Sequence, residues 1–126
     1  MLVTGFACAV SALVLLRASV AHRRDAVRRD AMRADLTRLV IAQDSAYDVL
    51  GRFVLVGAGY DADAIAFRLT NDGVALRTRT TGRDGWSAVL SDGEVLSDPR
   101  NCGIFIGEPK ASPHRALVVA GRATCW

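Results

Sequence analysis

Residues 2–50 have the sequence LVTGFACAVSALVLLRASVAHRRDAVRRDAMRADLTRLVIAQDSAYDVL, and this stretch decides the fold. Neither Gly nor Pro occurs from Phe6 to Leu50, and the strong helix formers Ala and Arg are frequent. Gly51 follows, and glycine is suited to ending a helix. The stretch therefore predicts one long helix that is apolar over 2–16, basic over 17–38 and amphipathic thereafter.

The apolar start of this helix has three interpretations. Residues 2–16 carry no charge, and an extension to Ala21 gives a helix of about 30 Å, the thickness of the hydrocarbon core of a bilayer. Arg17 would then reach toward the lipid headgroups. We favour a retained membrane anchor over residues 1–21. A signal peptide cleaved before His22 and a buried core helix are the alternatives.

Charge is distributed unevenly along the chain, whose net charge is +3. The segment 17–38 is basic, whereas the residues after it carry nine basic and ten acidic side chains. This balance argues against a C-terminal region that binds nucleic acid through bulk electrostatics. The basic helical segment is predicted to be a solvated face rather than a nucleic-acid site. Its charged residues are Arg17, Arg23, Arg24, Asp25, Arg28, Arg29, Asp30, Arg33, Asp35 and Arg38.

The last third of the helix has an apolar stripe. Its members recur at spacings of three and four, the period of one buried helix face. We therefore expect this face, with Gln43 among its members, to pack against the rest of the chain. The predicted packing residues are Leu36, Leu39, Val40, Tyr47 and Leu50.

Residues 52–126 predict a small β domain, called the head below. Strands are expected at 64–70, 74–80, 86–91 and 102–107, and 116–120 is a possible edge strand. The turn signal Asn71-Asp72-Gly73 predicts that the first two form a hairpin. The chain is thus divided into an apolar helix over 1–21, its continuation over 22–51, and the head. The fold class is α+β, a long helix packed on a small antiparallel sheet.

Cys102 and Cys125 flank the C-terminal segment, which contains Pro109 and Pro113 and cannot pair continuously with a strand. A disulfide between the two cysteines would hold this segment on the sheet and would contribute roughly 3 kcal/mol. We favour the disulfide because an apolar N-terminal segment suggests export. Two free thiols are the alternative. Cys8 is expected to remain a small apolar side chain in lipid.

No arrangement of residues in the sequence predicts catalysis. His22 and His114 have no Cys or acid at metal-ligand spacing, and the acid pairs 61/63 and 92/94 are typical of turns. Residues 57–62, GAGYDA, match a dinucleotide-binding pattern weakly, because alternating apolar residues follow instead of a helix. We therefore expect a protein that is not an enzyme, with no cofactor and no metal.

Several segments resemble type IV pilin-like proteins, the family that includes pseudopilins. The helix segment contains DLTRL (35–39), AQD (42–44), Tyr47 and GRF (51–53). The head contains GWSA (85–88), CGIFIG (102–107) and the terminal Cys125. Gly5-Phe6 before the apolar run resembles the prepilin cleavage point. With the helix segment, the resemblance extends over roughly residues 35–125.

The resemblance implies a subunit that assembles into, or primes, a type IV pilus or a type II secretion pseudopilus. It also implies other pilin-like subunits as partners and a single-pass location in the inner membrane. The predicted disulfide places the head outside the cytoplasm. The alternative function is an exported or anchored small β domain whose C-terminal loop binds a ligand or DNA.

Overall fold

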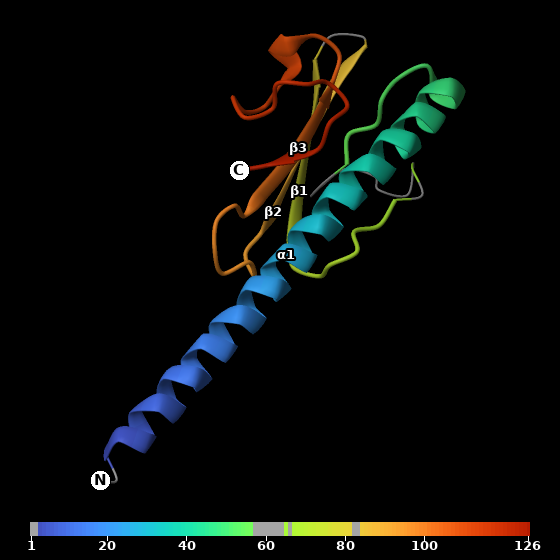
Figure 1. Ribbon diagram of the computed structural model, residues 1–126. Helices are drawn as coiled ribbons and strands as arrows, with labels where there is room; N and C mark the ends of the chain where they lie inside the picture. Colours follow the sequence, from blue (N-terminus) through green and yellow to red (C-terminus); the bar gives the residue numbers. More distant parts are fainter. Residues whose placement is uncertain (1–2, 57–64, 66, 82–83) are drawn as a thin grey trace.

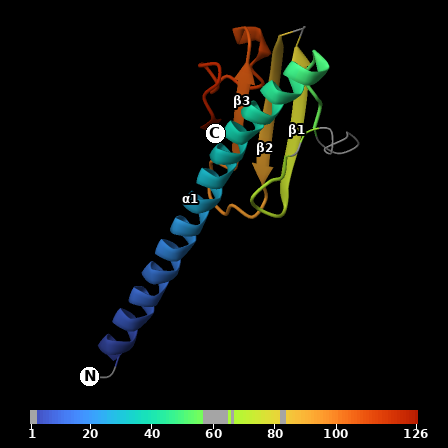
Figure 2. The same ribbon diagram turned by 90° about the vertical axis from the view of Figure 1, so that its right-hand side faces the viewer.

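The long helix predicted from the sequence is confirmed. The computed structural model describes residues 3–56, 65, 67–81 and 84–126. Helix α1 (Val3–Leu50) has 48 residues and is about 72 Å long at 1.5 Å per residue. It ends at Gly51, whose positive φ of 69° suits glycine and whose N–H donates to the Tyr47 carbonyl at 2.8 Å. Figures 1 and 2 show that the N-terminal half of α1 extends well beyond the sheet.

The described residues of the head form a four-stranded antiparallel sheet in the order β1-β2-β3-β4. Its strands are β1 (Val74–Thr81), β2 (Gly85–Asp92), β3 (Asn101–Ile106) and β4 (Thr124–Cys125), and a short 3-10 helix, η2 (Pro109–Ala111), follows β3. The C-terminal half of α1 lies across one face of this sheet (Figure 2). The predicted α+β class is therefore confirmed, and the arrangement is consistent with a pilin-like layout.

Three of the predicted strands correspond to β1, β2 and β3, but the expected first hairpin is wrong. Residues 67–69 are not a strand, and β1 pairs along its whole length with β2, from Val74 opposite Asp92 to Thr81 opposite Gly85. The physical reason lies in α1, because the Asp35 carboxylate accepts the Thr70 N–H at 2.9 Å. A helix side chain thus takes a backbone donor that the hairpin would have used.

The possible edge strand at 116–120 is also wrong. These residues form turns, in which Leu117 N–H donates to the His114 carbonyl at 3.0 Å. The sheet edge beside β3 is taken by β4, which places Cys125 opposite Cys102. The GAGYDA motif and the 61/63 acid pair lie outside the described residues.

The main core lies between α1 and the sheet. Leu36 and Leu39 are fully buried, as predicted, and Val40 is half-buried against the same cluster. Tyr47 is half-buried too, and its ring lies 4.7 Å from that of Phe53. From the sheet and the loops, this cluster includes Val54, Val56, Ile65, Phe67, Trp86, Ala88, Leu90, Cys102 and Ile104.

The prediction for Leu50 is wrong, because 47% of this residue is exposed. Val49 and Gly51 are exposed as well, so the described part of the head does not cover the last turn of α1. The buried face instead ends at Ala46. Helical spacing alone predicted Leu50, but spacing carries no information on where the opposing sheet ends.

The C-terminal segment covers the other face of the sheet at β3. Phe105, Ala111 and Leu117 form a second buried cluster there, with Trp126 packed against it. Gly103 makes this packing possible, since a Cβ at that position would lie 2.8 Å from the Trp126 ring. The two faces of the sheet are therefore covered by different parts of the chain, α1 on one and the segment after β3 on the other.

Candidate functional site: an exposed apolar stalk fastened to the head

Residues 8–24 of α1, called the stalk below, project beyond the head. Their aliphatic side chains are largely exposed, with fractions of 71% at Leu15, 68% at Leu16 and 62% at Val20. Since apolar surface of this extent is unfavourable in water, the stalk is the main candidate for an interaction surface. A transmembrane helix was expected at 1–21. Within the described residues, no helix combines the length and the apolar character needed to cross a bilayer.

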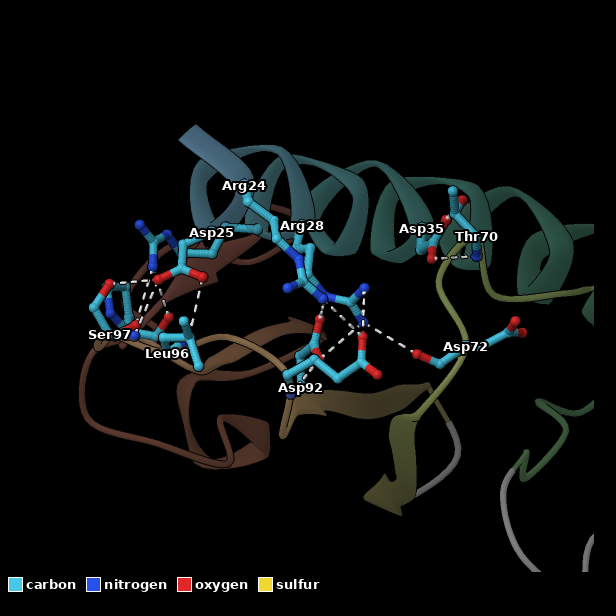
Figure 3. A network of polar contacts seen from close by, with 12 residues as sticks. Arg24, Asp25, Arg28, Asp35, Thr70, Asp72, Asp92, Leu96 and Ser97 are labelled. Atoms are coloured by element: carbon cyan, nitrogen blue, oxygen red, sulfur yellow. Dashed lines mark hydrogen bonds and ion pairs between the residues drawn. The ribbon is translucent and has the colours of Figure 1, made fainter. Parts of the chain in front are cut away.

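The first buried attachment of α1 to the head is Asp25, just after the stalk. Its buried carboxylate accepts hydrogen bonds from the N–H groups of Leu96 and Ser97, at 3.1 and 3.0 Å, and from the Ser97 hydroxyl at 2.7 Å (Figure 3). These hydrogen bonds lower the pKa of Asp25, and the bond from the Ser97 hydroxyl has the largest effect. The charged carboxylate therefore holds the loop between β2 and β3 against the helix.

One turn further along, Arg28 makes the second attachment. Its Nε and Nη2 donate to the two carboxylate oxygens of Asp92, at 2.6 and 3.0 Å, which is the bidentate geometry that arginine favours (Figure 3). The Asp92 side chain is fully buried and that of Arg28 is 13% exposed. The guanidinium also reaches Glu94 at 3.0 Å and the Asp72 carbonyl at 3.1 Å. The hydrogen bonds to Asp92 raise the pKa of Arg28.

Two further polar side chains of α1 bond to backbone groups that a neighbouring strand would otherwise pair with. Asp35 accepts from both the N–H and the hydroxyl of Thr70 (Figure 3). The Gln43 amide pairs with Val54 as a neighbouring strand would, donating to its carbonyl and accepting its N–H at 2.8 Å. Val54 and Thr70, which follow α1 in the chain, are thereby held without being part of the sheet.

These attachments correct the sequence interpretation of the basic segment. It was predicted to be solvated, but Asp25 and Asp35 are buried and Arg28 packs on the head. Composition gave no sign of this, since charged residues usually face water. A signal was available in the spacing, because Met32, Arg28 and Asp25 continue the stripe of Leu36 and Leu39 backward at intervals of three and four.

The predicted pairing of the head cysteines is confirmed. Cys102 and Cys125 lie opposite each other on β3 and β4, form a disulfide, and have Cα atoms 3.9 Å apart. Arg33 of α1 donates to the Cys125 sulfur at 3.4 Å, so the bridge also lies beside the helix. Cys8 is a free cysteine on the stalk and is exposed.

The C-terminal segment held by this disulfide presents basic and aromatic side chains. The His114 ring stacks on that of Trp126 with centroids 4.3 Å apart, and Arg115 and Arg122 are exposed. No acid follows Glu108 in the sequence. In the described part of the chain, no group of three His, Cys, Asp or Glu side chains is arranged to hold a metal.

Comparison with known proteins adds no relative: no protein-family model, curated protein or solved structure matches this chain. The structural class of the protein is defined by its fold and contacts alone. The molecule is an α+β protein in which one long helix packs by its C-terminal half on an antiparallel sheet and projects by its N-terminal half.

Proposed function

We propose that this protein is a non-enzymatic, pilin-like subunit that assembles into, or primes, a type IV pilus or a type II secretion pseudopilus. One observation carries the proposal: an exposed apolar stalk is continuous with a helix that is fastened to the head. An exposed helix of this kind needs a lipid or protein environment. The resemblance of segments 35–53 and 85–125 to pilin-like proteins supports the same function.

In this function the stalk has two successive environments. It is held in the inner membrane, in a single pass with the head outside the cytoplasm, until the apolar side chains of neighbouring subunits replace the lipid. The disulfide supports a head outside the cytoplasm, since disulfides persist in oxidising compartments. Asp25 and Arg28 keep the head at a fixed position on the helix, so an array of stalks would display an array of heads.

The experiment uses the native Cys8 as a reporter of association between stalks. Two differently tagged copies are expressed together, and membranes are treated with a bismaleimide crosslinker. We expect detergent-dependent extraction and a crosslinked pair carrying both tags. A soluble chain that starts near His22 and forms no such pair would overturn the proposal and favour an exported domain.

A matched pair of variants distinguishes specific association of the stalks from nonspecific hydrophobic association. Leu16→Gln removes an aliphatic side chain from the stalk at a site 68% exposed, and Leu96→Gln does so on the head at a site 64% exposed. We expect the first to lower Cys8 crosslinking and the second to leave it unchanged. Equal effects would indicate that the stalk has no special role.

A second candidate function rests on the C-terminal segment. The His114–Trp126 stack lies in a region with Lys110, Arg115 and Arg122 and no acid after Glu108. Aromatic rings among basic side chains suit single-stranded nucleic acid or an anionic ligand. Titration with single-stranded DNA at two salt concentrations tests this function, with Arg115→Glu as the variant expected to weaken binding. Nucleic acid would then be a partner of the head.

A further inference from the structure

The head has a basic groove between α1 and the C-terminal segment. The groove has a volume of about 490 Å³ and is lined by Arg33, Val118, Val119 and Arg122, among others. Val118 is 77% exposed and Val119 is 55% exposed. Within the described residues Arg122 takes part in no ion pair, whereas Arg33 pairs with Asp30. We call this surface the basic groove; it combines exposed aliphatic groups with an unpaired positive charge.

The last turns of α1 carry a surface of the opposite charge. Ile41, Asp44 and Asp48 are exposed and share one helix face, at spacings of three and four, and the exposed Val49 lies next to Asp48 in the chain. Val49 is 82% exposed and Ile41 is 65% exposed. No ion pair within the described part of the chain involves either aspartate. We call this surface the acidic face.

A second hollow lies beside the acidic face. It has a volume of about 490 Å³, and Ile41, Val49 and Phe67 are among the residues that line it. Arg38, whose guanidinium pairs with Asp35, also lies in this lining. Each of the two surfaces therefore offers exposed aliphatic side chains and a hollow able to receive those of a partner. Burying such groups supplies affinity, and opposite charges at the rim set orientation.

One copy of the chain cannot join these surfaces to each other. Figures 1 and 2 place the C-terminal segment and the end of α1 at opposite sides of the head. A contact between them must therefore join two copies. It is heterologous, since it uses a different surface on each copy, and such a contact repeats from copy to copy until it closes or extends as a filament.

We infer that the basic groove of one copy binds the acidic face of a second copy. The occupant is a second copy because this chain itself presents the complementary surface, with matching apolar groups and opposite charge. The inference rests on the proposed function: the stalks associate to form the assembly, and the contact inferred here joins the heads within it. Because the contact uses a different surface on each copy, successive heads in the assembly point in the same direction.

The test uses the full chain in membranes, with Cys8→Ser so that stalk crosslinks do not contribute. One tagged copy carries Val49→Cys and a differently tagged copy carries Val118→Cys, and a bismaleimide links them. We expect a mixed pair, and far less product when both copies carry Val49→Cys. Equal yields from the two combinations, or no mixed pair, would overturn the inference.

Charge reversal supplies the second arm. Arg122→Glu in the Val118→Cys copy is expected to lower the yield of the mixed pair about tenfold, and Asp48→Arg in the other copy is expected to restore it. Arg77→Glu, at an exposed position of β1, is the matched control and is expected to have no effect. A yield that is insensitive to Arg122→Glu would contradict the inference.

The native Cys8 distinguishes the failure of this inference from that of the proposed function. If crosslinks form at Cys8 but never between the substituted head positions, the head contact is wrong and stalk assembly stands. If neither forms, both proposals are wrong.

Discussion

Replacing Arg28 by Met should destabilise the protein strongly, because it leaves the Asp92 carboxylate buried without its partner. The Asp92 side chain is fully buried and its two oxygens accept from Arg28 at 2.6 and 3.0 Å. In Arg28→Met, the Glu94 N–H at 3.0 Å is the one described donor left to this carboxylate. Breaking a buried ion pair from one side costs about 3–5 kcal/mol.

For a domain of this size, 1 kcal/mol corresponds to a shift of roughly 4–8 °C in the midpoint of thermal unfolding. We therefore expect Arg28→Met to lower the midpoint by at least about 12 °C. The measurement is near-UV circular dichroism of the buried Trp86 in detergent solution. Asp92→Asn added to Arg28→Met should recover part of the loss, because a neutral amide is less costly to bury unpaired.

Arg24→Met is the matched control. Arg24 lies one turn before Arg28 and pairs with Glu94 at 3.6 Å, but both side chains are more than half exposed. Exposed pairs of this kind contribute about 0–1 kcal/mol, so the midpoint should barely change. Equal shifts for Arg24→Met and Arg28→Met would refute the view that a buried pair fastens α1 to the head.

Three further outcomes are expected. Leu39→Ala, at a fully buried site, should lower the free energy of unfolding by about 2–5 kcal/mol, and a loss below half a kcal/mol in denaturant titration would show that this face is not core. Because the pKa of Asp25 is lowered in the folded state, the stabilisation by its charged form is present above the unfolded-state value near 3.9 and is lost as pH falls through the lower folded value. Asp25→Asn should therefore be less stable than the native chain at pH 7, and the difference should shrink in acid titration; a constant difference down to pH 2 would contradict this. Reducing the Cys102–Cys125 disulfide should cost about 3 kcal/mol and raise hydrogen exchange at residues 124–126, and unchanged exchange there would show that the disulfide does not hold this segment.

The parts of the fold that could be predicted from the sequence depend on local signals. The absence of Gly and Pro predicted α1, Gly51 predicted its end, and alternation between turn residues predicted β1, β2 and β3. The Cys102–Cys125 pair followed from its place on either side of a proline-containing segment.

What could not be predicted depends on partners distant in the chain. Arg28 and Asp92 are separated by 64 positions, and although helical spacing places Arg28 on the buried face, nothing local identifies Asp92 as its partner. The same holds for Gln43, whose amide recognises the backbone of Val54 rather than a side chain. The absence of a strand at 67–69 has a similar cause, because Asp35 of another element accepts the Thr70 N–H.

The placement of the attachments along α1 has a mechanical consequence. Asp25, Arg28, Asp35 and Gln43 are spread along the helix, and each bonds to the head, which lies beside this part of α1 (Figures 1 and 2). A pull on the N-terminal end of α1 therefore loads these bonds in shear and in parallel, so that several must fail in one event. The rate at which force detaches the head is then the rate of this concerted failure. The head would thus withstand traction along the helix far better than the same bonds would if peeled apart one at a time from the side.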